Sequence, residues 1–270
     1  MKRLILLSFC FITFGLLSAQ NPEDVFKEGM AKMEAKDYNA AVEKFDLALA
    51  AKPDYIDAHF QRGMAKKALL QYNLAINSFN KVIELNPKHL EAYLERAELY
   101  SNMGRDNEAM QDFNKILEMK PDYLEAYVRI GNMYRRKGDS EKAIAEYQKA
   151  LKINPKYDKA HYNLALYFFN LEKNAEAMKH VREAITSNPN NAEAFALKGE
   201  IELNQKQYRP ALASLNKAIE LDNSVGSSYT LRGQAKFFTG DRKGACQDWK
   251  KAQELGDIEC EEYLGKYCKK

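Results

Sequence analysis

Apolar residues recur along this chain at three- and four-residue steps, which is the spacing of one face of an amphipathic helix. Ala41, Phe45, Ala48 and Leu49 fall on such a face, with polar residues between them. Each helical stretch is about 14 residues long, too short to be stable alone in water. After the first nineteen residues, no useful length alternates apolar and polar residues as a strand does. The pattern predicts an all-α chain whose neighbouring helices bury each other's apolar faces.

Five prolines punctuate this pattern at one constant interval, namely Pro53, Pro87, Pro121, Pro155 and Pro189. A constant period indicates one supersecondary unit copied along the chain, and a period of about 34 residues suits a pair of helices joined by a turn. Lys or Asn precedes the first four of these prolines, and such dipeptides close one pair and open the next. With the proline counted as position 32, the copies are 22–55, 56–89, 90–123, 124–157, 158–191, 192–225 and 226–259.

Three columns of residue type recur when the copies are aligned. Position 20 is Ala in all seven copies, and position 8 is Gly or Ala. Two small columns let the two helices of a copy approach closely, and a larger residue at position 24 fills the space that they leave. The residues at position 24 are Phe45, Phe79, Phe113, Tyr147, Val181, Leu215 and Trp249.

These columns resemble the tetratricopeptide repeat (TPR), in which Gly, Tyr, Ala, Phe, Ala and Pro stand at these offsets. The last two copies depart from the pattern, with Asn223 and Asp257 in place of the proline, as terminal repeats often do. The resemblance implies a right-handed TPR superhelix (α-solenoid) of seven helix-turn-helix repeats, followed by a capping helix and tail over 260–270. The fourth copy matches most fully, at Tyr127, Ile130, Gly131, Tyr134, Ala143, Tyr147, Ala150 and Pro155.

The first nineteen residues have the layout of a secretory signal peptide, with a basic start, an apolar run from Leu4 to Leu17, and a small residue at the end. We expect cleavage after Ala19 and export to the periplasm or cell envelope. A retained membrane anchor is the alternative, but a run of about 14 apolar residues is short of the roughly 20 that a span needs. Lipid attachment at Cys10 is disfavoured because Phe9 stands where a small residue is needed.

Three cysteines remain after signal cleavage, Cys246, Cys260 and Cys268, and three cannot all pair. The segment 260–267 carries apolar residues and follows a glycine turn, so we expect it to fold back on the last copy. Residues equidistant from such a turn face each other, which favours a Cys246–Cys268 disulfide with Cys260 free or buried. Another pairing, or three reduced thiols, stays open. The stretch Gly244–Ala252 also resembles the closing repeat of exported TPR proteins of Bacteroidota-type bacteria.

No catalytic or metal-binding constellation is found in the sequence. His59 and His161 both occupy position 4, where other copies carry aromatic or aliphatic residues, so packing is their favoured role. No His-X-X-His, His-Glu-X-X-His or Cys-X-X-Cys spacing occurs. The formal net charge is +3 and the charges are interleaved, without the basic stripe of a nucleic-acid binder. We therefore expect no enzyme, no cofactor, no metal and no nucleic-acid partner.

In the TPR family the first helix of each repeat lines a concave groove, through positions 2, 5, 6, 9, 12 and 13. In the first two copies of this chain these positions include Phe26, Met30, Phe60 and Met64. Flexible apolar side chains of this kind suit an adaptable contact with a peptide or a helix. Packing between repeats is the alternative role for them.

In the middle copies the same positions carry hydrogen-bond donors that could hold the carbonyls or carboxylates of an extended segment. An ion pair with Glu95, at the matching position of the preceding copy, is the alternative for the first of them. The predicted groove residues of these copies are Arg129, Asn132, Arg136, Tyr162 and Asn163.

TPR domains that clamp a C-terminal carboxylate combine two asparagines with three cations. Asn132 and Asn163 match, but Val128, Glu193 and Leu197 stand where the cations belong, so this mode is disfavoured. We expect an exported scaffold or adaptor that binds a protein or peptide in its groove without catalysis. The alternative is an envelope glycan or cell-wall binding module. The identity of the partner and the oligomeric state stay open.

Overall fold

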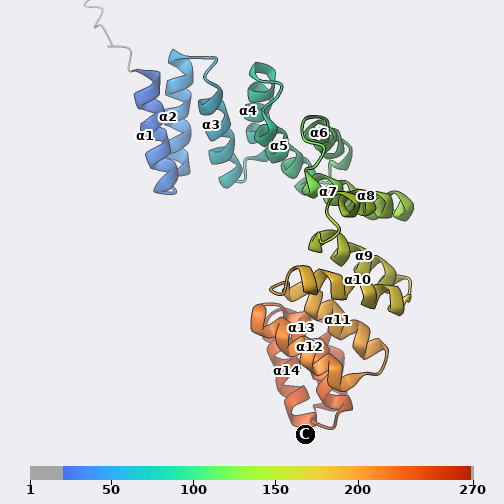
Figure 1. Cartoon of the computed structure of the whole chain (residues 1–270). Helices are drawn as coiled ribbons and strands as arrows, with labels where there is room; N and C mark the ends of the chain where they lie inside the picture. The colour runs from blue at the N-terminus through green and yellow to red at the C-terminus, as the bar shows by residue number, and fades with distance from the viewer. Residues whose placement is uncertain (1–20, 269–270) are drawn as a thin grey trace, which may run out of the picture. The chain divides into compact units, whose positions relative to one another are not determined.

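The computed structural model describes residues 21–268, which form 15 α-helices and no strand (Figure 1). The all-α fold predicted from the sequence is thereby confirmed. The expected signal peptide, its cleavage after Ala19, and Cys10 lie outside the described residues. None of the described helices is long and apolar enough to cross a membrane.

The helices repeat with the period of the sequence. Each first helix begins at position 1 of its copy, and α15 begins where an eighth copy would start. The first helices are α1 (Pro22–Glu34), α3 (Ile56–Ala68), α5 (Leu90–Asn102), α7 (Leu124–Arg136), α9 (Asp158–Asn170), α11 (Ala192–Asn204) and α13 (Gly226–Phe238). The second helices are α2 (Tyr38–Ala51), α4 (Tyr72–Leu85), α6 (Asp106–Met119), α8 (Ser140–Ile153), α10 (Asn174–Ser187), α12 (Tyr208–Leu221) and α14 (Arg242–Glu254), and α15 (Cys260–Tyr267) is the last of the described helices.

The chain divides between Met119 and Lys120 into two compact units. The first unit holds α1–α6, and the second holds α7–α15. Within each unit every helix packs against the next one along the chain. First helices of neighbouring copies also contact one another, as α1 does α3 and α7 does α9. Each unit is therefore built from helical pairs that bury one another in chain order, as the short helix length requires.

The small and large columns fit together as predicted. The residue at position 24 is fully buried in all seven copies. A Cβ added to Gly63 would lie 2.7 Å from the ring of Phe79, and one added to Gly131 would lie 2.5 Å from the ring of Tyr147. Glycine at position 8 thus lets the first helix lie directly on the aromatic residue of the second.

The turn inside each helical pair has a feature that the sequence analysis missed. Position 15 adopts a left-handed backbone conformation in every copy. Glycine accepts this conformation without steric cost, whereas other residues adopt it with strain. The residues are Gly104, Gly138 and Gly240 in three copies, and Lys36, Leu70, Glu172 and Lys206 in the other four.

Candidate functional site

The first helices of the second unit surround a hollow of about 580 Å³, which we name the central hollow. Its walls come from α7, α9 and the start of α11. Four of the nine predicted groove residues line it. These four are Arg129, Asn132, Tyr162 and Asn163, and they lie beside Glu125 and Lys159.

Glu125, which the sequence analysis missed, organises the charges of the central hollow. Its carboxylate accepts hydrogen bonds from Tyr157 Oη at 2.8 Å and Lys159 Nζ at 2.7 Å, and it pairs with Arg129 Nε at 2.8 Å. Burial acts to raise the pKa of Glu125, but the bonds from Lys159 and Tyr157 outweigh it and hold the pKa below its usual value. Arg129 thus pairs along its own helix, while Glu95, in the first unit, pairs with Lys67 at 2.5 Å. An ion pair between Arg129 and Glu95 would join the two units and stays a prediction.

The two asparagines of the central hollow have structural partners as well as a place in its wall. Asn132 Oδ1 accepts a hydrogen bond from Tyr147 Oη at 2.7 Å, which ties α7 to α8. Asn163 is buried, and its Nδ2 donates to the carbonyl oxygen of Lys159 at 2.8 Å, one turn earlier in α9. The Asn163 amide group is therefore less available to a ligand than its sequence position indicates.

A second hollow of about 370 Å³ adjoins the first, and we name it the acidic hollow. It is lined by α9, α11, α13 and the segment before α15, and it shares Tyr162, Leu166 and Glu193 with the central hollow. Burial, together with the negative charge of Glu193, raises the pKa of Tyr162 to about 12. The Tyr162 hydroxyl thus keeps its proton at neutral pH, between the two hollows.

The apolar residues predicted for the groove of the first two copies are partly buried against their own unit. Phe26 packs on Tyr55 with ring centroids 5.0 Å apart, and Phe60 stacks on His89 at 5.1 Å. Met30 packs against the cluster around Phe45, and Met64 against the cluster around Phe79. These contacts favour packing between helices, the alternative that the sequence left open.

Arg136, the remaining predicted groove residue, is exposed in the last turn of α7. It does not line either hollow of the second unit.

The histidines at position 4 have a specific structural role. Nε2 of His59 bonds the carbonyl oxygen of Pro53 at 2.8 Å, and Nε2 of His161 bonds that of Pro155 at 3.0 Å. The hydroxyl of Tyr127 makes the same contact with Pro121 at 3.0 Å. A polar aromatic residue at position 4 thus closes the turn that joins neighbouring copies. Across residues 21–268, no group of three or more His, Cys, Asp or Glu is placed to hold a metal ion.

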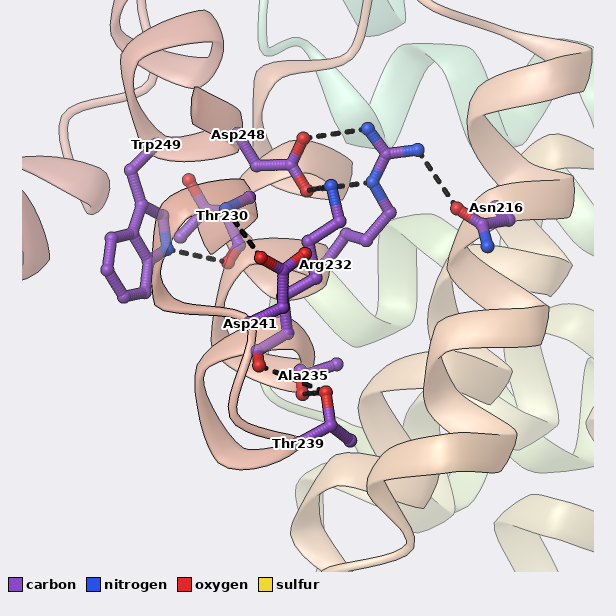
Figure 2. Close-up of polar contacts among 10 residues, drawn as sticks. Asn216, Thr230, Arg232, Ala235, Thr239, Asp241, Asp248 and Trp249 are labelled. Carbon is purple, nitrogen blue, oxygen red and sulfur yellow. Dashed lines mark hydrogen bonds and ion pairs between the residues drawn. The ribbon is translucent and has the colours of Figure 1, made fainter. Parts of the chain in front are cut away.

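A polar ladder joins the helices of several copies through position 7. Arg232 donates from Nε and Nη2 to the carboxylate of Asp248 at 2.8 and 2.7 Å, and from Nη1 to Asn216 Oδ1 at 3.0 Å (Figure 2). Asp248 lies 16 residues after Arg232 in the sequence, and Asn216 lies 16 residues before it. Arg96 repeats this arrangement with Asp112 and Asn80. One guanidinium therefore bonds the second helix of its own copy and that of the preceding copy.

The C-terminal cysteines lie where α15 packs on α14. Cys246 and Cys268 form a disulfide. Cys260 is buried and free, in one cluster with Ala252 and Trp249. This is the pairing that the turn geometry favoured over the alternatives.

Comparisons with known proteins agree with these features. Models of the tetratricopeptide repeat match residues 64–130 and 162–225, and a TPR repeat model matches residues 131–172. Together they span residues 64–225, more than half of the chain. The chain belongs to the tetratricopeptide repeat family. No curated protein matches this TPR protein at a significant level.

Solved structures similar to this TPR protein are themselves repeat proteins. A tetratricopeptide repeat protein from Parabacteroides merdae has a TM-score of 0.71 and 20% identity, over 93% of this chain and 100% of the other. PilF of Pseudomonas aeruginosa has a TM-score of 0.66 and 18% identity, over 78% and 96%. YrrB, described as a TPR protein with an unusual peptide-binding site, has a TM-score of 0.51 and 24% identity, over 70% and 97%. At these identities the likeness shows the fold.

Proposed function

We propose that this TPR protein is an interaction scaffold that binds a protein or peptide in the groove of its second unit, without catalysis of its own. The observation that carries the proposal is the pair of adjoining hollows along α7, α9, α11 and α13, which share Tyr162, Leu166 and Glu193. A recess that crosses consecutive first helices suits an extended segment better than a small molecule. The peptide-binding site of YrrB, a structure with the same fold, supports this choice.

The chemistry of the central hollow suits a peptide backbone. The Tyr162 hydroxyl is a protonated donor at neutral pH, and the Arg129 side chain is 46% exposed although it is paired with Glu125. Because Tyr157 and Lys159 also hold Glu125, the wall is ordered before a ligand arrives. A preorganised wall reduces the conformational entropy that binding must overcome.

We propose that the protein acts in the cell envelope. The basic and apolar start of the sequence supports export, and so does the Cys246–Cys268 disulfide, because disulfides persist in oxidising compartments. N-terminal sequencing of the protein from fractionated cells tests this. We expect a mature chain that starts at Gln20 in the envelope fraction. A chain that keeps Met1 and resides in the cytoplasm would contradict the location.

Site-specific photo-crosslinking in the native cell tests the binding function. A benzophenone amino acid replaces Tyr162 in the groove or, as a matched control, Tyr208, which stacks on Phe238 outside both hollows. We expect a protease-sensitive adduct at 162 that is absent at 208. Arg129→Glu should weaken that adduct by about tenfold through loss of a charge-assisted contact, with unchanged helical circular dichroism.

The outcomes separate the candidate functions. Equal adducts at 162 and 208 would refute the groove as the binding surface. An adduct that survives protease but disappears with a muralytic enzyme would establish the glycan or cell-wall alternative. Met64→Asp is a poorer probe, because Met64 packs against the core around Phe79 and its loss would disturb the first unit.

A further inference from the structure

The acidic hollow carries a charge that nothing in its wall balances. Its lining includes four carboxylates and no Lys, Arg or His. Two of the carboxylates lie on α11, one follows α12 and one precedes α15, so the fold of the second unit brings them together. They are Glu193, Glu200, Asp222 and Glu259.

These carboxylates differ from Glu125 and Asp248, two acidic groups of the second unit that have cationic partners. Glu125 has three partners, and Asp248 has both Arg232 and Lys236 at 2.7 and 2.8 Å. By contrast, no carboxylate of the acidic hollow forms an ion pair with any residue between 21 and 268. Asp222 accepts bonds only from the backbone and hydroxyl of Ser224. The hollow therefore holds negative charge that is free to meet a cation.

Apolar side chains complete the wall of the acidic hollow. Leu197 is buried, Leu166 and Leu231 are partly buried, and Val225 is 39% exposed. A ligand group that matches the hollow must then combine an apolar stem with a positive end. Lys and Arg side chains have this construction, because their methylene groups bury against apolar surface while the charged head stays at the edge.

Glu200 makes the hollow costly to maintain in the absence of a ligand. Burial, and then the charge of Glu259, raise the pKa of Glu200 above its usual value. A carboxylate with a raised pKa lowers the stability of the folded state at neutral pH, because the unfolded chain ionises more easily. A group that reduces stability and has no partner in the fold is typical of a functional site.

We infer that the acidic hollow receives a Lys or Arg side chain of the bound polypeptide, with its stem against Leu197 and Leu231 and its cation beside Glu200 and Glu259. The inference deepens the proposed function and rests on it, since it states which chemistry the groove selects. A space of about 370 Å³ accommodates one such side chain together with its neighbours. The same charges repel acidic and phosphorylated segments.

Fluorescence anisotropy with the mature protein, residues 20–270, tests the inference. The probes are three fluorescein-labelled heptapeptides that differ only in a central Arg, Gln or Glu flanked by leucines. We expect the Arg peptide to bind about tenfold more tightly than the Gln peptide, as a charge-assisted hydrogen bond provides, and the Glu peptide to bind least. The double variant Glu200→Gln/Glu259→Gln should abolish the preference for Arg.

Two controls separate recognition from folding. Glu220→Gln removes one charge on α12, where Glu220 pairs with Lys217 outside the hollow, and it should leave the preference intact. Glu200→Gln alone should raise the thermal unfolding midpoint and lower the affinity for the Arg peptide. A purely structural role would change the midpoint without changing the selectivity.

Equal binding of the three peptides, or no binding of the Arg peptide at millimolar concentration, would overturn the inference. So would an Arg preference that survives in Glu200→Gln/Glu259→Gln. These peptide results do not bear on the proposed function itself, which the crosslinked adduct at position 162 in the native cell tests separately. Loss of that adduct would in turn count against the groove itself.

Discussion

At the scale of single residues, position 7 shows how one site in a repeat takes on different chemistry from copy to copy. Arg96 and Arg232 bond two second helices through one guanidinium, whereas Ile130 and Leu164 occupy the same position in copies four and five. At Glu28 the charge is reversed, and it pairs with Lys44 at 2.5 Å. The position thus joins helices by an ion pair or by apolar packing, according to the residue that faces it from the second helix.

Arg232→Leu should destabilise the second unit by about 3 kcal/mol, because it leaves Asp248 buried with only Lys236 as its partner. The measurement is urea unfolding followed by circular dichroism. Arg232→Leu/Asp248→Leu should recover most of the loss, since it removes the buried charge as well. A double variant no more stable than Arg232→Leu would show that the ladder does not act through charge.

His180 should make the second unit sensitive to mild acid. Its pKa is lowered by burial, and further by His161 and Lys179, with Glu183 opposing them. His161 Nδ1 lies 3.0 Å from His180 Nδ1, and Phe168 stacks on the His180 ring. Because the folded state binds the proton less readily than the unfolded chain, stability is full above pH 6.5 and falls as the pH drops below it.

His180→Gln should therefore reduce the decrease in urea midpoint between neutral pH and about pH 5.5. A residual decrease is expected from His59 in the first unit, whose pKa burial also lowers. An unchanged decrease in the variant would show that His180 is not the responsible group.

At the scale of elements, the turn inside each helical pair is the most uniform feature after the helices themselves. All seven copies need a left-handed residue at position 15, yet only three supply glycine. Glu172 is exposed there and adopts φ of 57°. Four copies thus have a strained backbone at this turn, and the packing of their two helices offsets the cost.

Glu172→Gly should stabilise the second unit by about 0.5–1 kcal/mol, because relief of the left-handed strain exceeds the added entropy of the unfolded chain. Gly138→Ala is the matched control at the same position of the preceding copy, where nothing lies within 4 Å of an added Cβ, and it should destabilise by a similar amount. Urea midpoints measure both. Shifts of the same sign would refute a backbone origin.

The period, the helices and the small and large columns could all be predicted from the sequence, because each depends on a residue type that recurs at one position. Gly63 and Phe79 illustrate this, since their fit follows from size alone. The network around Glu125 could not be predicted in this way, because it joins α7 to the turn and first turn of α9 through particular rotamers. The position 7 ladder could have been predicted, because Arg96 and Asp112 have the same separation in sequence as Arg232 and Asp248. The signal appears only when position 7 is compared with the position of the acidic residue on the second helix.

At the scale of the whole molecule, the last repeat of the second unit ends on a helix that covers it. In the second unit α15 provides this cover, with Tyr263 stacked on Trp249 at 5.1 Å and Cys260 buried beneath it. The Cys246–Cys268 disulfide links α14 to the end of α15 across 22 residues of sequence. The cap is therefore held by both packing and a covalent bond.

Cys246→Ser/Cys268→Ser should lower the stability of the cap by about 3 kcal/mol, the loop-closure entropy of a bridge of this length. Hydrogen exchange should show α15 and α14 losing protection before α7–α12. Cys260→Ala keeps the disulfide and should perturb the cap less. Unchanged protection of α15 in the double variant would mean that packing alone holds it.

The place of α15 in the register also bears on how copies of the molecule meet. In a stack of identical repeats, the exposed side of the last repeat could pack on the first repeat of another chain, so the stack could continue from chain to chain. Here α15 takes the place of a next layer but is not followed by a second helix among the described residues, and it turns the exposed Glu261, Glu262 and Lys266 outward. Charged groups on this surface disfavour the packing of another chain's first layer against α15, although Tyr267 and Ile258 leave some apolar area exposed there.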